Sequence, residues 1–214
     1  MFALLARALS AIAPPACWEC GAGARPGEPL CAECRRSLRR LGPDLVTLAG
    51  VPVWAPVSYE GPAQALVRGM KFRGAVALAD PMAAQMVANA PAGLLEAPTV
   101  LVPVPLHPSR RRRRGYNQAE RLAAALSARS GLELSDCLLR GGPATRQVGR
   151  GRSERLESPP AHVTVRPGVL APADALLVDD VATTGATLAA CAQVLDRAGA
   201  RWVMAVTFAR TPGR

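Results

Sequence analysis

The chain has 214 residues, of which 50% are hydrophobic and 4% aromatic, and this suits one main domain with an aliphatic core plus a small appendage. Its formal net charge of +10 comes mostly from arginine, since Lys71 is the single lysine, and such a charge favours an anionic partner. Six cysteines in a chain of this length do not indicate a secreted disulfide scaffold.

Residues 1–17 are largely apolar, with Arg7 in the middle of the stretch. No basic region precedes this stretch, and it is too short to span a bilayer. We read it as an N-terminal helix, with a secretory signal as the alternative. We therefore expect no transmembrane segment and a cytoplasmic protein, one that is recruited to the inner face of the membrane if it acts there.

Two C-x-x-C pairs, Cys17 with Cys20 and Cys31 with Cys34, stand ten residues apart. Each pair turns two thiolates toward one point, so together they predict a tetrahedral shell of four thiolates for Zn²⁺. With all four positions filled by protein, the zinc would be structural and would supply much of the module's folding energy. A redox pair or two disulfides are the alternatives. We assign residues 1–50 to the helix and zinc module.

Residues 51–214 are expected to form the main domain, which opens with an alternating strand over 51–57. Two prolines in that strand suggest a sheet edge. Helices are expected over 62–70 and 77–90. Lys71 and Phe72 follow the first of these helices, where Lys71 either meets a phosphate or lies on the surface at a helix end.

The next apolar run, residues 99–105, predicts a buried strand that leads into five consecutive arginines, residues 110–114. We expect these arginines to form a basic loop. Asn117 is a helix cap, with Glu120 three residues later completing a capping box, for a helix that runs to about Ser130.

An apolar strand over 175–178 ends in two adjacent carboxylates, Asp179 and Asp180. Such a pair can accept hydrogen bonds from vicinal hydroxyls or hold a hydrated divalent cation. The loop 182–187 offers backbone N–H groups and threonine hydroxyls, and a helix N-terminus that favours an anion follows it. Together these features predict a site for a phosphorylated sugar. A receiver domain also carries paired acids, but it needs more chain after them.

These residues resemble the signature of type I phosphoribosyltransferases, whose ligand is phosphoribosyl pyrophosphate (PRPP). The resemblance implies an α/β fold with a parallel sheet, preceded here by the four-cysteine zinc module. It also implies that PRPP, together with Mg²⁺, is bound by Asp179, Asp180, Ala182, Thr183, Thr184, Gly185 and Thr187.

The run VPVPLHPSRRRRRGYNQAERLA, residues 102–123, closely resembles the ComF family, also called the GntX or amidophosphoribosyltransferase-like family. A second block of that family is matched over residues 145–155, and the zinc module extends the resemblance to nearly the whole chain. Ser158 departs from the pattern, because the family usually has asparagine there.

The ComF resemblance implies a competence accessory for DNA uptake in natural transformation, with PRPP, single-stranded DNA and a DNA-uptake helicase as partners. Arginine forks suit pyrophosphate or a nucleic-acid backbone, although a solvated basic face is the alternative. The residues expected to contact pyrophosphate or DNA are Lys71, Arg110, Arg111, Arg112, Arg113, Arg114, Tyr116, Asn117, Gln118, Arg146, Gln147, Arg152 and Arg155. Among these, Tyr116 is the only aromatic side chain that could stack on a base.

Whether the protein is an enzyme stays open at this point. Similar purine-salvage enzymes carry an aspartate base three residues after the second acid, and Thr183 stands there instead. Arginines in the basic loop do not readily give up a proton. Two further hypotheses therefore remain: a phosphoribosyltransferase with an unidentified acceptor, or a PRPP-sensing module without turnover.

Overall fold

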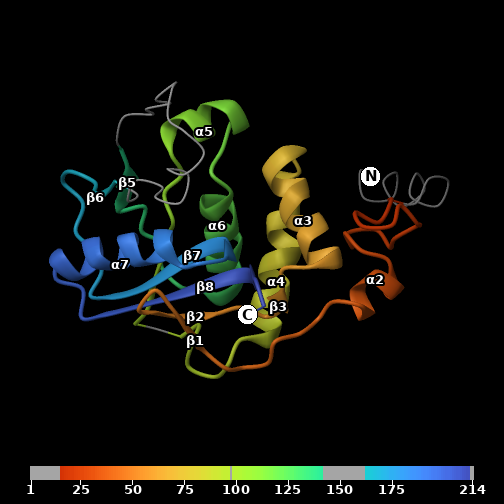
Figure 1. Cartoon of the computed structure of the whole chain (residues 1–214), viewed down its shortest axis with the longest axis horizontal. Coiled ribbons are helices and arrows are strands. Elements are labelled where there is room, and N and C mark those ends of the chain that lie inside the picture. Colours follow the sequence, from red (N-terminus) through yellow and green to blue (C-terminus); the bar gives the residue numbers. More distant parts are fainter. Residues whose placement is uncertain (1–14, 97, 142–161, 213–214) are drawn as a thin grey trace, which may run out of the picture.

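The computed structural model describes residues 15–96, 98–141 and 162–212 (Figure 1). Its main sheet has the strand order β1-β2-β8-β7-β4, and β3 also pairs with β8. β2, β3, β4, β7 and β8 run parallel, while β1 is antiparallel to β2. The strands of this sheet are β1 (Val46–Leu48), β2 (Val51–Trp54), β3 (Val57–Ser58), β4 (Val100–Pro103), β7 (Asp174–Ala182) and β8 (Trp202–Arg210). The expected α/β class with a mostly parallel sheet is confirmed.

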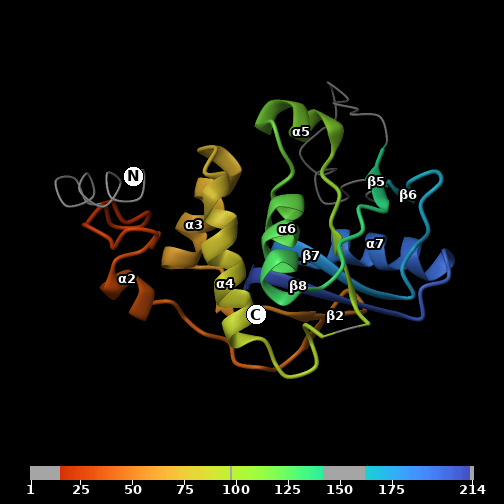
Figure 2. The same cartoon turned by 180° about the vertical axis from the view of Figure 1, so that it is seen from behind.

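Helices cover both faces of this sheet. α4 and α6 lie on one face and α7 on the other, as the two opposite views show (Figures 1 and 2). A short antiparallel pair, β5 (Leu138–Arg140) and β6 (Val163–Val165), lies apart from the main sheet. The helices are α2 (Ala32–Arg36), α3 (Gly61–Phe72), α4 (Ala79–Asn89) after a 3₁₀ turn (Val76–Leu78), α5 (Pro108–Arg114), α6 (Gln118–Ser130) and α7 (Ala186–Arg197).

The central strand β7 is apolar on both faces because each face carries a core. Leu176 and Val178 belong to the core under α4 and α6, whereas Ala175 and Leu177 belong to the core under α7. All four side chains are fully buried. This burial explains the unbroken apolar run, which is typical of a parallel strand covered on two sides.

The extended segment predicted over 51–57 is present as β2 and β3, but its predicted place at the sheet edge is wrong. β2 lies inside the sheet, between β1 and β8, and β1 is the edge strand. Pro52 pairs with Thr47 of β1, whereas the residues of β2 that pair with β8 begin only at Val53. The domain boundary that we expected at residue 50 therefore falls within a β-hairpin of the main sheet.

The five arginines form a helix, α5, and not the loop that we expected. Pro108 occupies its first turn, where a proline costs no hydrogen bond. The side chain of His107 accepts a hydrogen bond from the N–H of Ser109 at 3.2 Å, and Gly115 ends the helix at a φ of 85°. Strong local caps and the helix propensity of arginine outweigh the charge repulsion along the run.

The cysteine module packs against α3, beyond the main sheet (Figure 1). The ring of Trp18 lies directly on Gly69 of α3. A Cβ atom at Gly69 would come within 2.9 Å of two ring carbons of Trp18 and within 2.8 Å of Leu78 Cδ1. Glycine is therefore required here by the close approach of the module to the helix.

Candidate functional site

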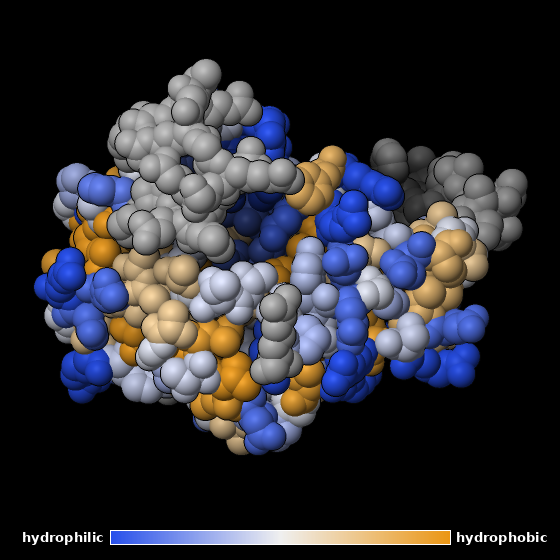
Figure 3. All heavy atoms as spheres, viewed as in Figure 1, coloured by the Kyte–Doolittle hydropathy of each residue, from blue (hydrophilic) through white to orange (hydrophobic). Residues whose placement is uncertain are grey.

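A cavity of about 410 Å³ opens at the carboxyl edge of the sheet, between α3, α5 and the end of β7. Figure 3 shows a recess with hydrophilic residues on its floor at this place. Acidic and basic side chains share its wall, which suits a ligand with both hydroxyls and phosphates. The charged lining consists of Lys71, Arg110, Arg113, Arg114, Arg140, Asp179 and Asp180.

The two carboxylates reach the cavity from opposite faces of β7, because successive side chains of a strand alternate. Asp180 is 1% exposed, and its Oδ1 atom lies 3.0 Å from Lys71 Nζ. Its other oxygen, Oδ2, is buried without a hydrogen-bond partner among the described residues. A buried carboxylate oxygen that lacks a partner is costly, so a ligand hydroxyl at this point would be stabilising.

Asp179 is partly buried, and its Oδ1 accepts a hydrogen bond from the N–H of Asp180 at 2.8 Å. Burial raises the pKa of Asp179 to about 8; the charge of Asp180 adds to this effect, and Lys71 opposes it. The folded chain therefore holds the Asp179 proton more tightly than the unfolded chain does. Ionising this group destabilises the fold increasingly from about pH 4 up to about pH 8.

We accordingly expect Asp179→Asn to stabilise the ligand-free protein. The amide cannot ionise but keeps the oxygen that accepts from Asp180. The free energy of unfolding should rise by at least about 1 kcal/mol at pH 8, and the gain should fade toward pH 4. Denaturant unfolding at several pH values measures this. Asp174→Asn, at the other end of β7, is the control. If both variants change the free energy of unfolding with the same dependence on pH, the raised pKa does not belong to Asp179.

Some arginines of α5 line the cavity and others lie outside it. Arg110, Arg113 and Arg114 line the cavity. Arg111 instead forms an ion pair with Glu120 at 2.7 Å, outside the cavity wall. The Glu120 carboxylate accepts hydrogen bonds from Arg111 and from the side-chain amide of Asn117. These bonds take the place of the bond to the Asn117 backbone N–H that the expected capping box would contain. Arg112 is exposed and is not part of the cavity lining.

Tyr116 and Asn117 do not offer the contacts that we expected of them. Tyr116 is 9% exposed, and its hydroxyl donates to the carbonyl of Met70, so its ring is not free to stack on a base. The buried amide of Asn117 donates to the carbonyl of Val104 at 2.9 Å and accepts from the N–H of Ala119 at 3.1 Å. Both side chains hold the surroundings of the cavity in place.

Gln118 lines the cavity and accepts a hydrogen bond from Arg114. Lys71, which the sequence left undecided, is brought into the cavity by the last turn of α3. The second predicted basic block, Arg146, Gln147, Arg152 and Arg155, lies outside the described residues. Arg140 at the end of β5 also reaches the cavity wall.

The loop after β7 encloses a second hollow of about 60 Å³, lined by Asp179 and residues 181–188. Gly185 has a φ of 80°, and a Cβ atom there would lie 2.7 Å from Leu48 Cβ of β1. The loop therefore needs glycine both for its conformation and for its contact with β1. α7 begins at Ala186 and its first residues line this hollow, so the helix N-terminus favours an anion here.

The four cysteines of the N-terminal module converge as expected. Their Sγ atoms all lie within 4.8 Å of one another, and Cys20 Sγ lies 3.8 Å from Cys31 Sγ. Sulfurs bound at about 2.3 Å around a tetrahedral zinc ion lie about 3.8 Å apart, so the cluster fits a zinc ribbon. Burial raises the pKa of Cys17, but backbone N–H groups outweigh it and lower the pKa to about 6.

The remaining cysteines, Cys137 and Cys191, are fully buried in the core of the main domain. Among the described residues, no helix combines the length and the apolar character that crossing a membrane requires.

No family model matches the chain. A curated protein, competence protein ComFC of Streptococcus pneumoniae (strain ATCC BAA-255 / R6), is 38% identical over 111 residues. The match covers 51% of this chain and 47% of that protein, so the chain spans about half the length of this relative. Over the matched half, the chain is therefore similar to a competence protein, and its four-cysteine cluster fits a zinc ribbon.

Proposed function

We propose that this protein binds PRPP with Mg²⁺ in the cavity at the carboxyl edge and assists single-stranded DNA uptake in natural transformation. The observation that carries the proposal is the pairing of an acidic edge with four arginines in one cavity of about 410 Å³. That volume falls in the range of about 300–1,000 Å³ that small-molecule sites occupy.

Each part of PRPP has a complementary group in this arrangement. The loop 183–187 and the N-terminus of α7 suit the 5′-phosphate, because threonine side chains and the first residues of a helix line the hollow there. Asp179 and Asp180 suit the ribose hydroxyls, and Asp180 Oδ2 lacks another partner among the described residues. The arginines of α5 and β5 suit the pyrophosphate, whose remaining charge Mg²⁺ would neutralise when bound. The four cysteines would hold a structural zinc ion.

The DNA role rests on the relative's name, a competence protein, and on the basic surface of α5. Arg112 is exposed outside the cavity lining, and arginine forks bind phosphate backbones without reading sequence. We propose that the protein works beside a DNA-uptake helicase at the inner face of the membrane.

Calorimetric titration with PRPP and Mg²⁺, with and without a single-stranded oligonucleotide, tests the proposal. We expect PRPP to bind, and we expect the oligonucleotide to change its affinity. Any such effect must be reciprocal, so PRPP should change the DNA affinity by the same factor. Failure of PRPP to bind under every condition would overturn the ligand assignment. Release of pyrophosphate with an added acceptor would identify a transferase.

A further inference from the structure

A second groove, of about 370 Å³, lies between the cysteine module and α3. Trp18 of the module forms one part of its wall, and Phe72 at the end of α3 forms another. Arg68 and Arg73 add two positive charges, against one acidic residue, Glu19. The groove thus combines aromatic rings with a net positive lining, and neither feature is needed for the PRPP site.

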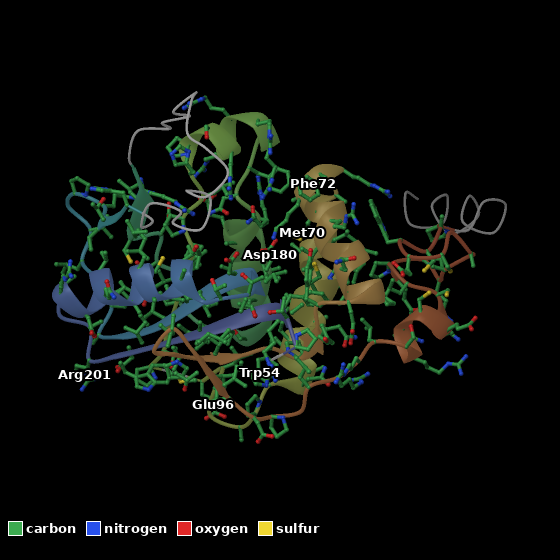
Figure 4. All side chains as sticks on the ribbon, viewed as in Figure 1. Trp54, Met70, Phe72, Glu96, Asp180 and Arg201 are labelled. Carbon is green, nitrogen blue, oxygen red and sulfur yellow. The ribbon has the colours of Figure 1, made fainter. Side chains whose placement is uncertain are left out.

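Phe72 is the most unusual residue of this groove. It is 67% exposed, although burying a phenylalanine ring usually stabilises a fold. Its ring lines both the groove and the PRPP cavity, so it stands on the rim that the two share. Figure 4 places it at the free end of α3, on the side of α5 and above Asp180. The guanidinium of Arg114 lies 5.9 Å from the centre of its ring.

Trp18, at the other wall of the groove, is likewise an aromatic ring with an arginine beside it. The ring is partly exposed, its edge rests on Gly69, and the guanidinium of Arg73 lies 6.0 Å from its centre. Each aromatic ring therefore has an arginine within reach, an arrangement that offers a flat surface for a base and a charge for the adjoining phosphate. Proteins that bind single strands without sequence preference combine these two elements.

We propose that this groove binds single-stranded DNA, with a base stacked on Phe72, and that it leads the strand to the rim of the PRPP cavity. The inference rests on the proposed DNA role and deepens it, because it names the aromatic surface that the buried Tyr116 does not provide. Single-stranded DNA fits better than a duplex, since only unpaired bases expose a face for stacking.

Fluorescence anisotropy of the full-length, zinc-loaded protein tests this with two probes of equal length, an oligothymidylate and the same backbone without bases. Phe72→Leu keeps an apolar side chain but removes the ring. It should weaken oligothymidylate binding about tenfold and leave the abasic probe unaffected. Phe72→Tyr should restore the affinity. Leu170→Ala, which shortens a side chain that is 90% exposed elsewhere, is the matched control and should change neither probe.

The variant Arg112→Ala, at the exposed arginine of α5 outside the PRPP cavity, separates this inference from the proposed function. It should weaken both probes alike, because it removes contacts to the backbone. If the unaltered protein binds neither probe, the DNA role and the groove both fail. If it binds both probes and Phe72→Leu changes neither, or both equally, only the stacking site fails, and a protein partner becomes the better occupant of the groove.

Discussion

Asp179→Asn combined with Asp180→Asn is expected to weaken PRPP binding at least about 100-fold. Hydrogen bonds to charged groups contribute about 1.5–3 kcal/mol each, and the double variant weakens those to both ribose hydroxyls. The amides keep the shape of the side chains, so the cavity should persist. Calorimetric titration in the presence of Mg²⁺ measures the loss.

Inorganic pyrophosphate provides the internal control for this variant. It lacks the ribose, and removing the charge of Asp180 leaves Lys71 without its partner. The double variant should therefore bind pyrophosphate as tightly as the unaltered protein, or more tightly. Asp174→Asn, at the start of β7, alters an ion pair with Arg201, which precedes β8, and should keep normal PRPP affinity. Unchanged PRPP affinity in the double variant would remove the acidic pair from the site.

The second large effect should come from the cysteine module. Replacing Cys17 and Cys34 with serine is expected to abolish zinc binding and to unfold residues 15–40. Structural zinc contributes about 10–16 kcal/mol of apparent binding free energy in zinc-finger peptides, so a small module cannot stay folded without it. The side chains of both residues are largely buried, which adds to the loss.

Metal analysis and hydrogen exchange measure these two effects separately. One zinc ion per chain should be present in the unaltered protein and absent in the variant. Amide protection should disappear from the module, and the face of α3 at Gly69, which Trp18 covers, should lose protection as Trp18 leaves it. Cys191→Ala is the control, because this core cysteine lies in the main domain. A variant without zinc whose module stays protected would contradict a structural role for the metal.

Local patterns in the sequence predicted much of the site. The apolar run before Asp179, the paired C-x-x-C spacing and the cap at Asn117 are each encoded within a few residues, and the structure has strand β7, the four-cysteine cluster and helix α6 at these places. The fold class followed from the resemblance to type I phosphoribosyltransferases.

Other features depend on contacts between distant residues, which a local pattern does not contain. Tyr116 lies within a family motif, yet its hydroxyl donates a hydrogen bond to the carbonyl of Met70, 46 residues away, and a local pattern does not show this contact. Lys71 and Asp180, which form an ion pair, are farther apart still in the sequence. The exposure of Phe72 also follows only from how α3 ends beside the cavity. For the arginines of α5, the missed signal was local, since the flanking proline and glycine mark a helix.

The strand order also has a consequence for how the chain folds as it is synthesised. β7 and β8 occupy the middle of the sheet, yet they follow β2 and β4 along the chain. A nascent chain that has reached residue 165 holds the outer strands without the strands that join them. The cysteine module lies at the start and closes over short sequence separations. It can therefore fold on the ribosome first, while the cavity at the carboxyl edge forms only after the last strand has emerged.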